Sequence, residues 1–137
     1  MTFEEFLAER ASMNKPIELK VGMELGGGLY LGEFKGEHYI VSHYNTEKEL
    51  PWKEAIEYCK NLSEGGYSDW FLPNKEELKF AYTQFKANLD VLDFDNAWYW
   101  SNEVYNDHNS YITDFNGAYQ GGCSITAKKH VRAFRKL

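Results

Sequence analysis

Apolar and polar positions in the first part of the chain repeat with two different periods. Residues 2–11 have the spacing of a short amphipathic helix, whereas residues 17–25 alternate strictly, which predicts a half-buried strand. After a run of glycines, residues 29–34 and 38–43 read as the two strands of a hairpin that turns at Lys35-Gly36. This part of the chain therefore predicts a helix followed by strands.

Two longer amphipathic helices are predicted in the middle of the chain. The first covers residues 51–62 and opens at Pro51, because a missing N–H is harmless in the first turn of a helix. We expect Gly65 and Gly66 to end it in the left-handed conformation. The second starts at Asn74, a capping residue with Glu77 three positions on. Its apolar stripe consists of Leu78, Ala81, Tyr82, Phe85 and Leu89.

Beyond residue 90 the helical period stops and short strand-like runs begin. They are residues 97–101, 110–115 and 130–135, separated by loops rich in Asn, Asp and Gly. Strands, two helices and strands in this order predict an α+β fold, with the two helices bracing a mostly antiparallel, twisted sheet. We divide the chain into an N-terminal arm, residues 1–25, and a domain, residues 26–137.

Composition narrows the possible functions. The net charge is −6 and no basic face stands out, which argues against nucleic-acid binding. No run approaches the roughly 18 apolar residues of a membrane span, and the N-terminus lacks the basic and apolar regions of a signal peptide, so we expect synthesis and folding in a cytoplasm. Aromatic residues make up 17% of the chain, and tyrosine, the commonest of them, suits binding surfaces as well as cores.

The segment GGYSDWFLPNKEEL, residues 65–78, joins the two predicted helices. Pro73 favours an extended approach to the second helix. Trp70 is either a plug that fills the angle between the helices or a ring that stacks on a ligand, and we favour the plug. Structural roles are predicted for Trp52, Trp70, Trp100, Gly65, Gly66 and Pro73.

The same segment carries a family resemblance. Together with YWS at Tyr99–Ser101, DFNG at Asp114–Gly117 and VRAFR at Val131–Arg135, it resembles the Lcl C-terminal domain family over residues 52–135. This family occurs in bacterial surface proteins and tailed-phage proteins, and it is similar to the C-type-lectin fold. The family usually has Arg and Ser at two positions where this chain has Phe71 and Asn102.

The resemblance implies that residues 39–43 lie beside residues 130–135. It also implies that the segment Asn102–Gly122 forms an irregular surface, where tyrosines alternate with short polar residues as they do in antibody combining sites. The alternative is a plain solvated turn, since Asn, Asp, Gly and Ser also make turns. The predicted ligand-binding residues are Tyr105, Asn106, Asp107, His108, Asn109, Tyr111, Asn116 and Tyr119.

Metal binding and catalysis have little support in the sequence. Asp90, Asp93 and Asp95 offer oxygen ligands for Ca²⁺, but a polar loop after a helix is the simpler interpretation, and we predict neither a metal nor a cofactor. The two cysteines, Cys59 and Cys123, lack a C-x-x-C spacing and are expected to be free thiols.

A catalytic cysteine would need a histidine partner, for which His43, His108 and His130 are the candidates. Cys59 lies on an apolar helix stripe, where a thiol is inert. We therefore predict that the chain is not an enzyme. In the last run, Arg132 and Arg135 point to opposite faces, so we expect one of them to be partly buried and paired.

These observations predict a non-catalytic binding or structural module of a virion, of the tailed-phage type. The expected partner is another virion protein or a host-surface receptor, with homo-oligomers formed through the N-terminal arm, because a strictly alternating strand at residues 17–25 invites edge pairing. Neither nucleic acid nor membrane insertion is expected. The alternative is a small cytoplasmic enzyme or regulator on the same fold.

Overall fold

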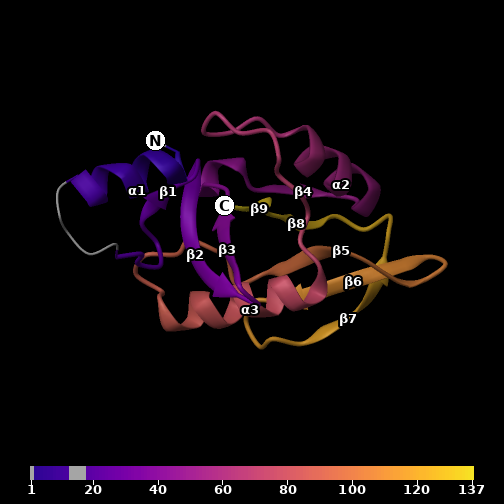
Figure 1. Cartoon of the computed structure of the whole chain (residues 1–137). Helices are drawn as coiled ribbons and strands as arrows, with labels where there is room; N and C mark the ends of the chain where they lie inside the picture. Colours follow the sequence, from indigo (N-terminus) through magenta and orange to yellow (C-terminus); the bar gives the residue numbers. More distant parts are fainter. Residues whose placement is uncertain (1, 13–17) are drawn as a thin grey trace.

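The structure, a computed structural model of the chain, describes residues 2–12 and 18–137. It has the predicted mixed α+β composition (Figure 1). The helical elements are α1 (Phe3–Ser12), the short 3₁₀ helix η1 (Tyr44–Thr46), α2 (Trp52–Asn61) and α3 (Lys75–Ala87). The strands are β1 (Glu24–Leu25), β2 (Gly28–Phe34), β3 (Glu37–Val41), β4 (Lys48–Leu50), β5 (Trp98–Asn106), β6 (Asn109–Asp114), β7 (Gln120–Ser124), β8 (Lys129–Val131) and β9 (Phe134–Lys136).

The described strands form two sheets rather than the single sheet that was predicted. Their orders are β1-β2-β3-β9 and β4-β8-β5-β6-β7. Most neighbours pair antiparallel, whereas β5 and β8 pair parallel. The run 130–135 is divided between the sheets, because β8 joins one and β9 the other. The expected pairing of residues 39–43 with the end of the chain is confirmed, with Tyr39 opposite Lys136 and Val41 opposite Phe134.

Helices α2 and α3 lie on opposite faces of the sheets (Figure 1). Trp100 of β5 packs in one hydrophobic cluster with Ala55 of α2, while its neighbour Tyr99 packs in another with Leu78 of α3. Successive side chains of a strand point to opposite faces, so each helix covers its own face. We call the clusters the α2-side core (Leu25, Tyr30, Ile40, Ala55, Cys59, Trp70, Leu72, Trp100, Ile112, Val131, Ala133) and the α3-side core (Leu29, Leu31, Tyr39, Val41, Leu78, Ala81, Phe85, Leu92, Phe94, Tyr99, Phe115, Phe134).

Helix α3 begins as its sequence predicts. The Asn74 side chain accepts the N–H of Glu77 at 2.8 Å, and the Glu77 carboxylate accepts the N–H of Asn74 at 2.8 Å, which completes a capping box. The helix ends at Ala87, so Leu89, expected in the apolar stripe, lies beyond it and is 61% exposed. That part of the prediction is wrong, because the stripe continues past the point where the helix stops.

The strand predicted over residues 17–25 forms only at Glu24–Leu25, and its first residue lies outside the described residues. Residues 21 and 22 form a turn instead, with Gly22 at φ +90°. A Cβ at Gly22 would lie 2.5 Å from Cβ of Val91, so this turn depends on glycine. The long exposed edge expected from the alternation is therefore absent between residues 18 and 23.

The hairpin of β2 and β3 turns at Lys35-Gly36 as predicted, and both residues have positive φ angles of 52° and 78°. This is the conformation of a two-residue hairpin turn that follows the twist of the strands. A bulge between Tyr30 and Gly32 shifts the register. Strands β4 and β7 were not predicted from the sequence.

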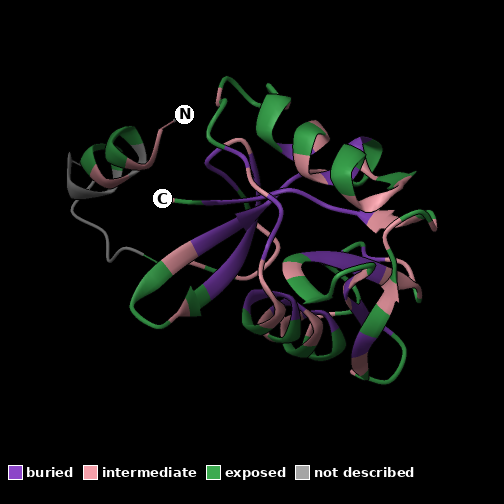
Figure 2. Cartoon of the chain, turned by 90° about the vertical axis from the view of Figure 1, so that its right-hand side faces the viewer, coloured by how far each residue is buried: buried purple, intermediate pink, exposed green. Residues whose placement is uncertain are grey.

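Helix α1 lies at the edge of the molecule (Figure 2), and its residues Phe3 and Leu7 pack against the α2-side core. It starts with a half-formed capping box, in which Thr2 Oγ1 accepts the N–H of Glu5 at 3.0 Å. The ring of Phe3 lies 6.0 Å from that of His38 on β3. Among the described residues, no helix is long and apolar enough to cross a bilayer.

Candidate functional site

The glycines of the GGYSDW segment form a tight turn and do not end α2. The helix stops at Asn61 and its C-cap, Leu62, is extended. Gly65 and Gly66, with φ angles of +63° and +85°, form the turn between Glu64 and Tyr67 instead. The predicted left-handed conformation is confirmed, but its place as a helix exit is wrong. A Cβ on Gly65 would lie 2.3 Å from Cα of Gly27, so the turn packs directly on the glycine run before β2.

Trp70 is a buried structural residue. It is 3% exposed, and its indole Nε1 donates to the carbonyl oxygens of Glu64 (3.3 Å) and Tyr67 (3.1 Å). It packs in the α2-side core. The expected position between the two main helices is wrong, because α3 lies on the other face of the sheets. The ring therefore belongs to the core that α2 covers.

The remaining residues with predicted structural roles connect three neighbouring parts of the chain to β5: Trp52 from α2, Leu50 of β4 through Trp100, and Pro73 from the segment itself. Trp52 Nε1 donates to the carbonyl of Ser101 at 2.8 Å, and the fully buried Trp100 donates to that of Leu50 at 2.7 Å. Pro73 is buried and its carbonyl accepts the N–H of Asn102 at 2.8 Å.

The two positions that depart from the family pattern both connect the loop to a strand: Asn102 belongs to β5, and Phe71 pairs with β9. The Asn102 side chain donates to the carbonyl of Leu72 at 3.0 Å. Phe71 forms two backbone hydrogen bonds with Phe134, each of 2.9 Å. The loop between α2 and α3 is therefore built to hold its neighbours in place.

The segment Asn102–Gly122 is an ordered three-stranded meander, not the irregular surface that was expected. β5 runs through Asn106, β6 returns from Asn109, and β7 follows antiparallel. β6 has six residues and spans roughly 17 Å. Predicted binding residues near the turn between β5 and β6 are thus separated by that length from those near the turn between β6 and β7.

Tyr105 and Tyr111 form an aromatic surface on the α3 side of this meander. Their ring centroids are 5.1 Å apart in an edge-to-face arrangement, and Lys75 Nζ lies 3.8 Å from the Tyr111 centroid. The Tyr105 ring rests on Gly122, where a Cβ would lie 2.5 Å from ring atoms, yet Tyr105 is 52% exposed. We call Tyr105, Tyr111 and Lys75 the tyrosine face.

Tyr119 lies on the opposite face of the sheet. It is 65% exposed, and its ring is 5.9 Å from that of Trp98. A Cβ on Gly121 would lie 2.8 Å from the Tyr119 ring, whereas Gly122 points to Tyr105. Since adjacent strand residues point to opposite faces, the three tyrosines do not form one surface. Asn116 is exposed in the turn next to Tyr119 and likewise lies away from the tyrosine face.

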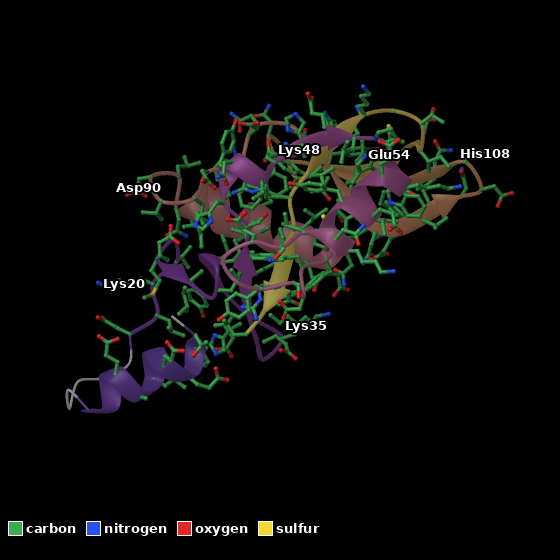
Figure 3. All side chains as sticks on the ribbon, turned by 90° about the horizontal axis from the view of Figure 1, so that it is seen from above. Lys20, Lys35, Lys48, Glu54, Asp90 and His108 are labelled. Atoms are coloured by element: carbon green, nitrogen blue, oxygen red, sulfur yellow. The ribbon has the colours of Figure 1, made fainter. Side chains whose placement is uncertain are left out.

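The polar residues of the β5–β6 turn lie at the end of the molecule farthest from α1, where Figure 3 labels His108. Asn106 Oδ1 accepts the N–H of His108 at 3.1 Å and the side-chain amide of Asn109 at 2.7 Å, which shapes the turn. Asp107 and His108 are exposed. Of the predicted polar partners, Asn106 and Asn109 are thus engaged within the turn, and Asp107 and His108 face solvent.

The three aspartates considered for Ca²⁺ have different surroundings. Asp93 pairs with Arg132 at 2.6 Å, Asp95 lies 3.6 Å from His130, and Asp90 is exposed in the turn that follows α3 (Figure 3). The structure does not bring them together into an oxygen cage.

A second cluster of acidic and imidazole groups was not recognised as a set from the sequence. Ligand atoms of Glu47, Asp95 and His130 all lie within 4.8 Å of one another. They come from the segment before β4, the loop before β5, and β8. Glu47 and His130 are 83 positions apart, so no local motif could join them. They line a pocket of about 410 Å³, together with Tyr44, Lys48 and Glu49.

Burial and a hydrogen bond with Asp95 raise the pKa of Glu47 above its ordinary value, although contacts with Tyr99, His130 and Arg132 oppose the rise. The hydroxyl of Tyr99 donates to Glu47 at 2.6 Å, and burial followed by this bond raises the pKa of Tyr99. The pocket therefore holds the carboxyl group of Glu47, whose pKa burial raises, close to the carboxyl group of Asp95.

Both arginines of the last run are buried and paired, where only one was expected to be. The Arg132 guanidinium is fully buried and donates to Asp93 and to the carbonyl of Ser42. Arg135 donates to Asp69 at 2.7 Å and to the carbonyl of Gly26 at 2.9 Å.

Cys59 is buried in the α2-side core, as predicted. Burial raises its pKa to about 12, so the thiolate is scarce at neutral pH. Cys123 is half-buried, and both cysteines are free in the structure.

Comparison with known proteins gives one family. The sequence model of the Lcl C-terminal domain matches residues 32–135, which extends the resemblance noted above through most of the β2–β3 hairpin. The search of curated proteins found none that matches the chain.

Proposed function

The chain belongs to the Lcl C-terminal domain family, and from that premise we propose that it is a non-catalytic binding module of a virion, of the tailed-phage type, with the tyrosine face as its contact surface. Membership of the family supports a lectin-like binding module of the kind found in bacterial surface and phage proteins. We also propose that the domain has a C-type-lectin-like fold. The partner is another virion protein, and a host-surface receptor is the alternative partner.

The observation that carries the proposal is the exposure of the Tyr105 ring above a glycine. An exposed ring contributes little to folding, whereas tyrosine buries much area on binding and loses little conformational entropy. Tyr105 packs edge-to-face on Tyr111, and Lys75 lies over the Tyr111 ring, so the face is held in one arrangement before a partner arrives. A preformed aromatic surface with one cation suits a partner that offers both apolar and acidic groups.

The absence of catalysis is also a proposal, and the state of Cys59 supports it. Its raised pKa and complete burial remove the nucleophile that a Cys–His mechanism would need. The histidines considered as partners of Cys59 have other surroundings. His43 hydrogen-bonds Glu24, His130 hydrogen-bonds Glu47, and His108 is exposed at the hairpin tip.

We further propose that the N-terminal arm, residues 1–25, docks on a neighbouring subunit of the same chain. The position of α1 at the edge of the molecule supports this role (Figure 2). The edge strand that the alternation predicts is reduced to Glu24–Leu25, so the outward face of α1, away from Phe3 and Leu7, supplies the docking surface.

The test compares two exposed tyrosines on opposite faces. Tyr105→Ala removes the centre of the tyrosine face, and Tyr119→Ala is the matched control, since it removes a ring of similar exposure from the other face. We expect Tyr105→Ala to weaken binding by about 2 kcal/mol, or roughly 30-fold, and Tyr119→Ala to leave it unchanged. Binding is measured as incorporation into purified virions and as pull-down of virion proteins, beside a thermal melt of each variant.

Equal incorporation of both variants, with both folded, would contradict the role of the tyrosine face. Recovery of the wild-type chain only from the cytoplasm, in cells that release virions without it, would favour the alternative of a cytoplasmic enzyme or regulator.

A further inference from the structure

The pocket formed by Glu47, Asp95 and His130 has the donor geometry of a metal site. The distance from His130 Nδ1 to Glu47 Oε2 is 2.9 Å, and to Asp95 Oδ2 it is 3.6 Å. An ion held about 2.0–2.2 Å from each donor needs donor atoms about 3–4 Å apart. These side chains therefore require only small rotations to share one ion.

The groups around the donors orient them as the outer shell of a metal site does. His130 Nε2 lies 3.1 Å from Glu49 Oε1, which leaves Nδ1 directed into the pocket. A metal-binding histidine almost always donates its other N–H to a carboxylate or carbonyl in this way. Glu47 Oε1 accepts from Tyr99 at 2.6 Å and from Arg132 at 3.3 Å, so Oε2 is the oxygen that remains beside His130.

Asp95 is also fixed by its neighbours. Its backbone N–H donates to the Tyr99 hydroxyl at 2.8 Å, and its carboxylate accepts the hydroxyl of Tyr44 at 3.1 Å. Tyr99 thus holds both Glu47 and Asp95 in position. The result is one imidazole nitrogen and two carboxylates whose ligand atoms all lie within 4.8 Å of one another.

The local charge favours a cation. Glu47, Glu49 and Asp95 contribute three carboxylates around His130. Two cations lie nearby: Lys48 lines the pocket, and Arg132 pairs with Glu47 Oε1 at 3.3 Å but makes its shorter ion pair, of 2.6 Å, with Asp93. A divalent ion would neutralise the facing carboxylates of Glu47 and Asp95 and relieve their mutual repulsion.

We propose that Glu47 Oε2, Asp95 and His130 Nδ1 bind one divalent transition-metal ion, of the Zn²⁺ or Mn²⁺ class, with water from the open pocket completing the coordination. One imidazole with two carboxylates suits these ions, whereas Ca²⁺ requires six to eight oxygen ligands. The ion joins the segment before β4, the loop before β5, and β8, three parts of the chain that are far apart in sequence. It acts as a clamp on the sheet that carries the tyrosine face.

The test is calorimetric titration of Zn²⁺ and of Mn²⁺ into the full chain after chelator treatment. We expect saturable binding of one ion per chain and a Tm that rises with metal concentration, because binding to the folded state alone is stabilising. His130→Gln and Asp95→Asn should each abolish that binding. Glu49→Gln, which removes only the outer carboxylate, should weaken it about 10–100-fold.

His108→Gln is the matched control, because this exposed histidine beside Asp107 lies at the hairpin tip, and its variant should bind the metal as wild type does. Thermal unfolding of each variant in the presence of chelator verifies that it folds without metal. Asp95→Asn alters a carboxylate that is 39% exposed, so this variant provides a test even if His130→Gln is unstable. Four results would each overturn the proposal. The wild type fails to bind one Zn²⁺ or Mn²⁺, or folded Asp95→Asn binds the metal as tightly as the wild type does. Alternatively, His108→Gln loses binding, or the wild type binds Ca²⁺ more tightly than either Zn²⁺ or Mn²⁺.

Discussion

At the scale of single residues, buried polar groups hold the end of the chain to the body. Arg135 donates to the carboxylate of Asp69 and to the carbonyl of Gly26, and its guanidinium lies 3.7 Å from the centre of the Tyr67 ring. The Arg135 side chain is only 8% exposed, so loss of its counterion leaves a buried charge unpaired.

This pair predicts a specific loss of stability in acid. The hydrogen bond from Arg135 is the main reason that the pKa of Asp69 lies below its ordinary value. The contribution of Asp69 is therefore complete above the pKa of the unfolded chain, near pH 4, and is lost as the pH falls through the lower folded value. The free energy of unfolding in urea, measured from pH 7 down to about pH 2, should fall more in wild type than in Asp69→Asn. Parallel curves for the two proteins would contradict this account.

Trp70 gives a second prediction at this scale. Trp70→Ala should lower the free energy of unfolding by about 3–5 kcal/mol, because it opens a cavity in the α2-side core and removes the indole donor that the carbonyls of Glu64 and Tyr67 share with backbone N–H groups. Trp70→Phe is the control, since it keeps most of the apolar volume and should cost less. Chemical unfolding of the three proteins measures the difference, and wild-type stability in Trp70→Ala would show that the ring is not a structural plug.

At the scale of secondary structure, elements specified by local chemistry were predictable. The start of α3 depends on Asn74 and Glu77, which are three positions apart, and the hairpin of β2 and β3 depends on a glycine in a two-residue turn. Both signals lie within a few residues of the structure they determine. The end of α2 was predicted to within one residue, but the residues expected to terminate the helix were wrong, because Gly65 and Gly66 form a separate turn a few residues later.

Elements specified by tertiary pairing could not be read from the sequence. β7, with the sequence QGGCS, has little strand propensity, and it forms because it pairs with β6 along five positions. The short strand β4 forms by pairing with β8 near the other end of the chain. Conversely, residues 18–23 alternate like a strand but turn at Gly22, and Gly22 and Met23 form backbone hydrogen bonds with the single residue Tyr30 of β2.

At the scale of the whole molecule, the position of each site depends on which face of a sheet a residue occupies. Tyr105 and Tyr119 belong to one tyrosine-rich segment, but β7 places Gly122 under one and Gly121 under the other. A one-residue offset thus assigns the rings to opposite faces. The sequence indicated which residues are suited to binding, but it could not show that they form separate surfaces.

The metal-site residues illustrate the same limit. The sequence groups Asp95 with its neighbouring aspartates as a possible Ca²⁺ ligand, yet its partners in the pocket are Glu47 and His130. β4 pairs with β8, and β8 lies beside β5, so three distant segments meet at this pocket. Knowledge of the sheet order is needed to find this set, because no local motif joins its members.

The central claim is that this module contacts its partner in a virion through the tyrosine face. The most direct test compares hydrogen–deuterium exchange in the isolated chain with exchange in purified particles. In the particle, we expect slower exchange for backbone amides of residues 104–111, which carry Tyr105 and Tyr111, and unchanged exchange for residues 116–119 on the far turn. Particles that lack the chain, or that contain it with identical exchange at residues 104–111, would contradict the claim.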